Sequence, residues 1–261
     1  MIAIEDKDNV RTVTLNRPPS NGLCRELLQE LESAARASAA DPAVRCVVLR
    51  SALPKYFSSG LDPEQLLGPS GEPSPELFST LFSTYRAWLE LGKPTVASID
   101  GYALLGGCIV AMMCDFRLMA RETGRIALSE IRLGLSPTPL FLSRLLALGA
   151  TPAAARQLAL KGRTLKAEEA LAAGLVDRVV DAASLSDETW AEARSLCRMP
   201  PQAYAAVKRD LALVAGPDFE TLWRLSMDSF PRLMASPEAR EALGALGERK
   251  RKETARGTAS S

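Results

Sequence analysis

One glutamate in this sequence has surroundings that suit proton transfer. Glu130 lies within the apolar stretch Ile126–Leu135. Apolar surroundings destabilise the charged form of a carboxylate, so they raise its proton affinity and make it a better base. The competing interpretation is a surface glutamate that pairs with Arg132. Residue types alone leave both interpretations open.

Two glycine-containing turns could present backbone amides to a ligand, namely Lys55–Asp62 and Asp100–Cys108. Neither turn has the spacing of a phosphate-binding P-loop or of a dinucleotide-binding glycine motif. Glycine lets a backbone N–H group approach a ligand without a Cβ in the way. If Gly106 and Gly107 begin a helix, their amides suit an anionic oxygen. A tight turn followed by close helix packing would explain the same residues.

The sequence contains no histidine among its 261 residues. Ser-His-Asp triads, Cys-His pairs and histidine-ligated zinc are therefore excluded. Catalysis has to use carboxylates, lysine, tyrosine, cysteine or backbone amides.

The five cysteines are odd in number and never spaced C-x-x-C. This usage is typical of reduced core residues rather than of a disulfide framework. The acidic N-terminus lacks the apolar core of a signal peptide. Both features predict a reducing, cytoplasmic compartment.

Charge and hydropathy argue against two classes of partner. The chain has 32 basic and 31 acidic side chains, so no excess of positive charge is available to neutralise a nucleic-acid backbone. Its longest apolar run, Ala103–Cys114, contains two glycines and is too short to span a bilayer. We therefore expect neither a nucleic-acid nor a membrane partner.

Short β-branched runs alternate with amphipathic stretches over the first two thirds of the chain, and helical patterns dominate the rest. The expected strands are Val10–Leu15, Cys46–Arg50, Thr95–Ile99, Phe116–Ala120, Arg125–Leu128 and Leu175–Val180. The expected helices are Leu23–Ala40, Leu77–Leu91, Gly106–Met113, Leu140–Leu148, Pro152–Leu160, Lys166–Ala173, Glu188–Met199, Gln202–Ala215, Phe219–Met234 and Pro237–Lys252. Between the second expected strand and the second expected helix, residues 51–76 are predicted to form a loop.

Pro200-Pro201 cannot continue a preceding helix and marks the expected boundary between two regions. We predict a core over residues 1–200 and a helical oligomerisation region over residues 201–261. Several apolar residues of the second region recur at helical spacing and need a partner surface. These are Phe219, Leu222, Trp223, Leu225 and Phe230.

Five ordered motifs resemble those of the enoyl-CoA hydratase/isomerase (crotonase) family, over nearly the whole chain. They are Leu15-Asn16-Arg17-Pro18 with Asn21, Phe57-Ser58-Ser59-Gly60-Leu61-Asp62, Lys93-Pro94-Thr95-Val96-Ala97 with Gly101-Tyr102-Ala103, Gly106-Gly107-Cys108 with Ala111-Met112-Met113-Cys114-Asp115, and Glu130-Ile131-Arg132-Leu133-Gly134.

The resemblance implies an α/β fold, a spiral of strand-strand-helix units followed by a helical trimerisation region. It implies an acyl-CoA ligand, with the amides of Leu61 and Gly106 forming an oxyanion hole around the thioester carbonyl. Preorganised donors of this kind stabilise an enolate without any side chain. Lys55, Ser58 and Ser59 fall where the family holds the phosphate and adenine parts of CoA. No cofactor is required, and a homotrimer or homohexamer is expected.

Departures from the family pattern indicate which of the family's reactions this sequence favours. Hydratases of the family hold water between two glutamates, whereas here Glu130 is kept and Ile109 replaces the other. Bulky residues at 137–142 also replace the glycine-rich stretch that hydratases have after the Glu-Ile-x-Leu-Gly motif. Both features resemble the single-glutamate Δ3,Δ2-enoyl-CoA isomerases. The prediction is therefore an acyl-CoA isomerase of fatty acid metabolism that uses Glu130 as its proton shuttle. The alternatives are a decarboxylase of a CoA or carrier-protein thioester, an enoyl-CoA hydratase, and a non-catalytic acyl-CoA-binding protein.

Overall fold

The computed structural model describes residues 1–67 and 74–258, without the side chains of Pro75 and of residues 249–258. The strands are β1 Ile2–Lys7, β2 Val10–Leu15, β3 Cys46–Ser51, β4 Tyr56–Ser58, β5 Thr95–Ile99, β6 Tyr102–Leu104, β7 Phe116–Ala120, β8 Arg125–Ala127, β9 Leu165–Lys166 and β10 Arg178–Val180. The helices are α1 Arg25–Ala40, α2 Pro63–Leu66, α3 Pro75–Leu89, α4 Gly106–Met112, η1 Glu130–Leu133, α5 Thr138–Ala147, α6 Pro152–Lys161, α7 Ala167–Ala172, η2 Ala182–Ser184, α8 Leu185–Leu196, α9 Pro201–Val214, α10 Phe219–Met234 and α11 Pro237–Thr258. No helix within these described residues is long and apolar enough to cross a membrane.

The strands form two sheets. The larger has the order β1-β2-β3-β5-β7-β10, and the smaller has the order β4-β6-β8-β9. Among the strands of the described residues, only the pairs β1–β2 and β8–β9 are antiparallel. Successive units send one strand to each sheet: β3, β5 and β7 join the larger sheet, while β4, β6 and β8, which follow them, join the smaller one. This is the expected strand-strand-helix repetition.

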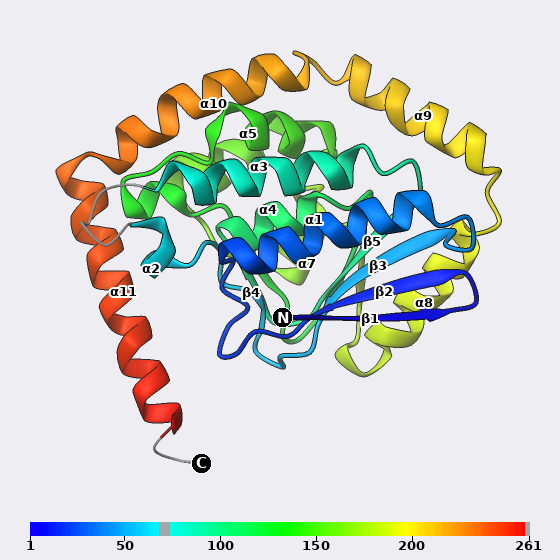
Figure 1. The fold of residues 1–261 in the computed structure, drawn as a ribbon, viewed down its shortest axis with the longest axis horizontal. Helices are drawn as coiled ribbons and strands as arrows, with labels where there is room; N and C mark the ends of the chain where they lie inside the picture. The colour runs from blue at the N-terminus through cyan, green and yellow to red at the C-terminus, as the bar shows by residue number, and fades with distance from the viewer. Residues whose placement is uncertain (68–73, 259–261) are drawn as a thin grey trace.

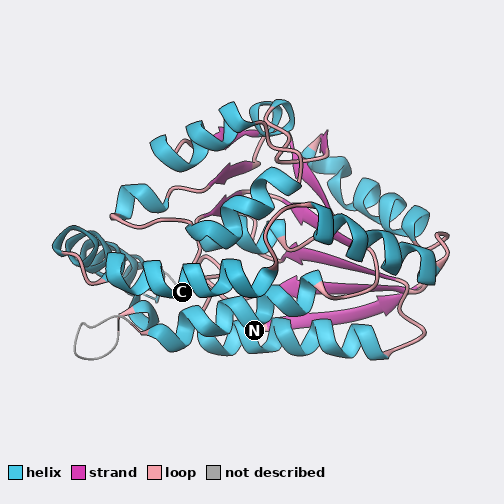
Figure 2. Cartoon of the chain, turned by 90° about the horizontal axis from the view of Figure 1, so that it is seen from above, coloured by secondary structure: helices cyan, strands magenta, loops and turns pink. Residues whose placement is uncertain are grey.

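Helices cover both faces of the larger sheet, as Figure 2 shows from above. The strands β3, β5 and β7 are almost entirely buried, which explains their continuous β-branched and apolar runs. On one face the main core contains the buried side chains of α1, α3 and α4. On the other face α8 packs over a second, smaller core that includes Val48, Val96 and Leu118. The site described below therefore rests on a scaffold packed from both sides.

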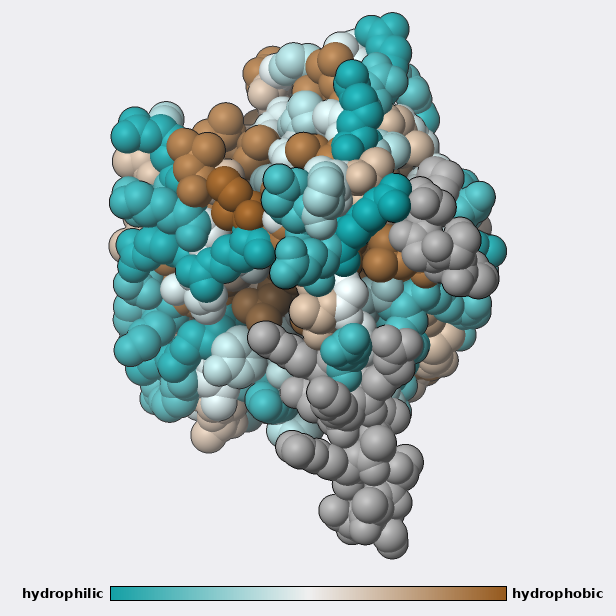
Figure 3. Space-filling model, turned by 90° about the vertical axis from the view of Figure 1, so that its left-hand side faces the viewer, coloured by the Kyte–Doolittle hydropathy of each residue, from teal (hydrophilic) through white to brown (hydrophobic). Residues whose placement is uncertain are grey.

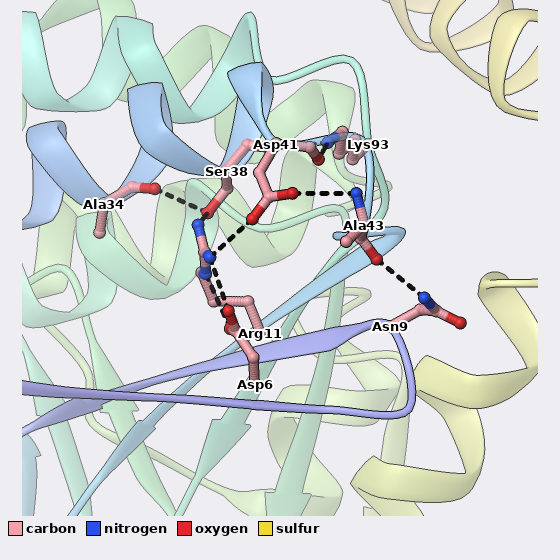
Figure 4. A network of polar contacts seen from close by, with 8 residues as sticks. All are labelled: Asp6, Asn9, Arg11, Ala34, Ser38, Asp41, Ala43 and Lys93. Carbon is pink, nitrogen blue, oxygen red and sulfur yellow. Dashed lines mark hydrogen bonds and ion pairs between the residues drawn. The ribbon is translucent and has the colours of Figure 1, made fainter.

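A polar network attaches the end of α1 to the edge of the larger sheet (Figure 4). Arg11 on β2 donates to the carboxylates of Asp6 and Asp41 at 2.6 and 3.1 Å. The ammonium group of Lys93 donates to the carbonyl oxygens of Ser38 and Asp41, both at 2.6 Å. Helix C-terminal carbonyls lack partners within the helix, so a lysine there satisfies them and complements the helix dipole.

The expected elements agree with the structure except at a few places. The ranges of β2, β5, β7 and α10 are the predicted ones. The predicted loop over residues 51–76 is wrong in part, because β4, α2 and the start of α3 lie within it; its stretch 68–73 lies outside the described residues. Strands β1, β6 and β9 were not expected. All five cysteines are free and four are buried, as predicted, whereas Cys197 is only half-buried.

The apolar residues of the last helices do not behave as the sequence suggested. Leu222 and Phe230 on α10 are buried in the main core of their own chain, and Phe219 and Trp223 pack against it. Leu225 on α10 remains exposed, and further exposed apolar side chains lie on α9, whose residues are all at least partly exposed. Figure 1 shows α9 at the periphery of the molecule, where Tyr204 and Lys208 attach it to Asp115 at 3.0 Å each. The expectation that these five residues need a partner surface is therefore wrong for Leu222 and Phe230, which their own chain covers, whereas Leu225 stays exposed.

Candidate active site

Three parallel strands of the smaller sheet bring the candidate residues together. Leu61 follows β4, Gly106 follows β6 and Glu130 follows β8 within a few residues. Because β4 pairs with β6 and β6 with β8 in parallel, the carboxyl ends of all three strands meet at one edge of the sheet. Ligand sites of open α/β sheets lie at such edges. Leu61, Gly106 and Glu130 accordingly line one cavity.

The amides of Leu61 and Gly106 lie where two loops approach closely. Gly60 has a φ of +96°, and a Cβ at this residue would lie 3.0 Å from the nitrogen of Gly106. A Cβ on Gly106 would lie 3.1 Å from the nitrogen of Leu61. Within the described residues neither amide donates a hydrogen bond to another protein group. Two neighbouring free donors can hold a developing oxyanion.

The start of α4 is built to present its first amide. Leu105, which precedes the helix, has φ 54° and ψ −128°, a conformation that non-glycine residues rarely adopt. A Cβ on Gly107 would lie only 2.2 Å from the carbonyl oxygen of Ser58, so glycine is needed for α4 to pack against β4. This packing holds the Gly106 amide beside the loop that carries Leu61.

The carboxylate of Glu130 is buried and has no protein partner. The residue is 6% exposed, and neither carboxylate oxygen forms a hydrogen bond within the described residues. Arg132 is exposed and does not reach either carboxylate oxygen, so the interpretation as a surface pair is wrong. Burial raises the pKa of Glu130 to about 7. Such a group can both take up and release a proton near neutral pH.

The cavity beside Glu130 is small and mostly apolar, with a volume of about 40 Å³. Ile109 on α4 contributes to its wall, so Glu130 is the single carboxylate among the described lining residues. Two C-terminal helices close the cavity through Phe230 on α10 and Leu243 on α11, and Phe230 stacks on Phe78 with ring centroids 3.7 Å apart. Figure 3 views the molecule from the side where α2 and α11 lie, and shows hydrophobic patches among hydrophilic ones.

The three residues predicted to hold CoA occupy different environments. Lys55 is exposed, with its ammonium group 5.3 Å from the centre of the Tyr56 ring. Ser59 is half-buried, and its hydroxyl lies 2.9 Å from that of Ser20. Ser58 is fully buried, donates to the carbonyl oxygen of Asn21 and accepts from the amide of Gly60. The Ser58 side chain therefore supports the loop, and it is not placed for contact with a ligand.

An ion pair holds the loop that carries Leu61 in place. Arg17 donates to the carboxylate of Asp62 at 2.7 Å and to the carbonyl oxygen of Gly22 at 2.9 Å. Asp62 is buried and also accepts from the amide of Glu64, which caps α2. The pair holds the residue next to Leu61 and so limits movement of the candidate oxyanion donor.

Sequence reasoning missed part of the cavity wall. Phe230 and Leu243 lie more than 90 positions from Glu130 in the sequence, and their periodicity indicated only an amphipathic helix. Thr138 also lines the cavity, and nothing in its local pattern distinguishes it. Among the described residues, no group of three or more acidic or cysteine side chains could hold a metal ion.

Comparisons with known proteins agree with this geometry. A family model described as Enoyl-CoA hydratase/isomerase matches residues 5–254. The probable enoyl-CoA hydratase echA8 of Mycobacterium bovis is 35% identical over 209 residues, which are 79% of this chain and 79% of that protein. The probable enoyl-CoA hydratase of Rhizobium meliloti is 33% identical over 250 residues, which are 94% of each chain.

Solved structures of the same fold cover nearly the whole chain. Human mitochondrial delta3-delta2-enoyl-CoA isomerase superposes with a TM-score of 0.89 at 24% identity, covering 97% of this chain and 98% of its own. An enoyl-CoA hydratase from Mycobacterium avium subsp. paratuberculosis superposes with a TM-score of 0.82 at 28% identity, covering 93% and 97%. The predicted α/β crotonase fold is confirmed.

Proposed function

This chain belongs to the enoyl-CoA hydratase/isomerase family, and we propose that it is an acyl-CoA isomerase that moves the double bond of a 3-enoyl thioester into the conjugated 2-enoyl position. One observation carries the proposal: a single buried carboxylate without a protein partner lines the same apolar cavity as two free backbone amides. One base and an oxyanion site are sufficient for an allylic proton shift.

The proposed reaction begins with the carboxylate of Glu130, which takes a proton from the α carbon of the 3-enoyl thioester. The electrons of the C–H bond move onto the carbonyl oxygen and form a dienolate. The amides of Leu61 and Gly106 donate to that oxygen and stabilise its charge. Glu130, now protonated, returns the proton to the γ carbon, and the double bond forms between the α and β carbons. The burial that raises the pKa of Glu130 to about 7 favours both proton transfers.

Binding of CoA is proposed to use the segment that leads into the oxyanion loop. Lys55 is exposed and could meet a phosphate away from the reacting carbons, and Ser59 lies between Lys55 and Leu61. Ser58 would contribute indirectly, because its hydroxyl holds the carbonyl of Asn21 and the amide of Gly60. The reaction needs no cofactor besides the CoA of its substrate.

Hydration of a 2-enoyl thioester is the second candidate. The names of the two relatives at 33% and 35% identity favour it, because both are called probable enoyl-CoA hydratases. Against it stands Ile109, whose side chain occupies the cavity wall where a second carboxylate would help to hold a water molecule.

A panel of thioesters distinguishes these reactions. The protein would be incubated separately with a 3-enoyl, a 2-enoyl and a malonyl-type CoA thioester, and the products followed by absorbance and mass. We expect a product of unchanged mass with conjugated-enoyl absorbance from the 3-enoyl substrate. Addition of the mass of water to the 2-enoyl substrate, without isomerisation of the 3-enoyl one, would favour the hydratase. Loss of carbon dioxide from the malonyl-type substrate would favour a decarboxylase.

We also propose that α9 contributes to a homotrimer or homohexamer, so that the C-terminal region 201–261 serves in oligomerisation. Val207, Leu211, Leu213 and Val214 on this helix are each more than half exposed. A hollow of about 630 Å³ lies between α9 and the helices α3, α5 and α10. Sedimentation should show an oligomer at micromolar concentration, and Leu211→Glu should weaken it. A stable monomer of the unmodified protein would contradict the proposal.

A further inference from the structure

Thr138, the first residue of α5, combines two unfavourable features at the wall of the Glu130 cavity. The residue is 1% exposed, and its hydroxyl oxygen has no hydrogen-bond partner among the described residues. A buried hydroxyl without a partner destabilises the folded state, because it has lost the hydrogen bonds it makes with water. A valine of the same shape would avoid this loss.

The backbone of Thr138 is also strained. Its φ is +70°, in the left-handed region that β-branched residues rarely enter. The hydroxyl of Ser136 accepts a hydrogen bond from the Thr138 amide at 3.1 Å and helps to hold this conformation. Strained residues of this kind are concentrated at ligand-binding sites. Glycine would relieve the strain, yet the chain has a residue with a hydroxyl group here.

The chemistry of the cavity limits what this hydroxyl could bind. Besides Thr138, the polar side chains among the described lining residues are Glu130 and Ser136, and the Ser136 hydroxyl already accepts from a backbone amide. None of these lining residues is a lysine or arginine, so an anionic group on the acyl chain would find no counterion and would lie near Glu130. A neutral oxygen fits better, because a threonine hydroxyl both donates and accepts.

The size of the cavity limits where that oxygen can be. The cavity has a volume of about 40 Å³, and the stacked rings of Phe78 and Phe230 form part of its wall with Leu243. These side chains leave little room for a long acyl chain in this arrangement. An oxygen that reaches Thr138 must therefore lie within a few atoms of the reacting carbons.

We propose that Thr138 is a specificity-determining residue whose hydroxyl binds a neutral hydroxyl or keto oxygen on a short acyl chain. The preferred substrates would be short acyl thioesters that carry such an oxygen beyond the reacting carbons. The inference rests on the proposed function to the extent that an acyl thioester occupies this cavity.

Paired substrates that differ only in this oxygen test the proposal. Rates would be measured with pent-3-enoyl-CoA and 5-hydroxypent-3-enoyl-CoA for the unmodified protein, Thr138→Val and Thr138→Ser. We expect the unmodified protein and Thr138→Ser to prefer the hydroxylated substrate by about three- to tenfold in kcat/KM, the range of one neutral hydrogen bond. Thr138→Val should lose the preference through a lower value for the hydroxylated substrate alone.

Thr189→Val is the matched control. Thr189 is a buried threonine that donates to Ser98 at 3.1 Å, in the core that α8 covers on the other face of the larger sheet. Its loss should leave the preference unchanged. Thermal unfolding of each variant would establish that it is folded, and Thr138→Ser remains informative if Thr138→Val does not fold.

Binding measurements separate this proposal from the proposed reaction. Pentanoyl-CoA and 5-hydroxypentanoyl-CoA have no double bond to move, and calorimetry would give their affinities for the same proteins. A preference for the hydroxylated ligand that Thr138→Val abolishes supports the proposal, even if no isomerisation is found. No preference in the unmodified protein, or an equal loss of affinity for both ligands in Thr138→Val, would overturn it, whether or not the protein is an isomerase.

Discussion

Replacement of Glu130 by glutamine should remove a pH-dependent loss of stability and greatly slow turnover in the same protein. The pKa of Glu130 is raised from 4.5 to about 7 because the carboxyl is buried. The folded state therefore keeps a proton that the unfolded state has already lost. The stabilisation from this proton is complete below pH 4.5 and is lost as the pH rises through about 7. The difference between the two pKa values corresponds to about 3 kcal/mol.

Glutamine at this position cannot ionise, so Glu130→Gln should escape that loss. The quantity to follow is the unfolding free energy of Glu130→Gln minus that of the unmodified protein. Between pH 4.5 and pH 8.5 this difference should rise by about 3 kcal/mol. Urea unfolding of both proteins at several pH values measures this, and the contributions of all other titrating groups cancel in the difference. Glu241→Gln is a suitable control, because Glu241 is exposed and its carboxylate is hydrated in both states.

The same substitution should lower the isomerisation rate by about 10²–10⁴-fold, the usual contribution of general acid–base catalysis. Exchange of the α proton in heavy water should be lost together with turnover, because one group performs both transfers. In the unmodified protein kcat/KM should rise with pH through about 7 as Glu130 loses its proton. A stability difference that does not depend on pH would refute the burial argument. Near-normal isomerisation by the folded variant would refute the mechanism.

Three further substitutions test other parts of the structure. Lys55→Ala should raise KM by up to about fivefold with little change in kcat, since an exposed ion pair with a phosphate is worth at most about 1 kcal/mol; a collapse of kcat at constant KM would contradict this role. Phe230→Ala should shift the acyl-chain preference towards longer thioesters by opening the wall next to Phe78, at a cost of about 3–5 kcal/mol in stability measured by urea unfolding; an unchanged chain-length profile would exclude Phe230 as the limit. Arg117→Met should cost about 2–5 kcal/mol in the same assay, because the buried guanidinium donates to the carbonyl oxygens of Cys114 and Leu175, which would lose their donor; a loss below 1 kcal/mol would show that these bonds are dispensable.

Much of the scaffold could be predicted from local patterns. The strands Thr95–Ile99 and Phe116–Ala120 are buried on both faces, so their sequences are nearly continuous apolar runs that periodicity detects. Strand β1 was missed because all its residues are exposed or half-exposed, which leaves no apolar run. Strands β4 and β6 are three residues long, and they are strands only because β6 lies beside β4 and β8 lies beside β6.

The chemistry available to the protein also follows from composition and order. The absence of histidine excludes whole classes of mechanism, and the apolar neighbours of Glu130 indicate a candidate base. Whether Glu130 is a surface residue or a buried one could not be decided from those neighbours. The cavity around it is lined by side chains from several distant segments, among them Ile109, Phe141 and Leu243.

Tertiary structure alone identifies Thr138. Only when all the described neighbours are in place is it visible that its hydroxyl has no hydrogen-bond partner among them. The same holds for α10 and α9. Their sequences are both amphipathic, yet α10 buries several side chains in the core of its own chain, whereas α9 buries none and, within the described residues, contacts a core only through the half-buried Tyr204. Periodicity shows that a helix has an apolar face, whereas the surface which covers that face is set by long-range packing. Local sequence therefore determines the elements and the available chemical groups, and long-range packing determines which of those groups are desolvated, paired or left free to react.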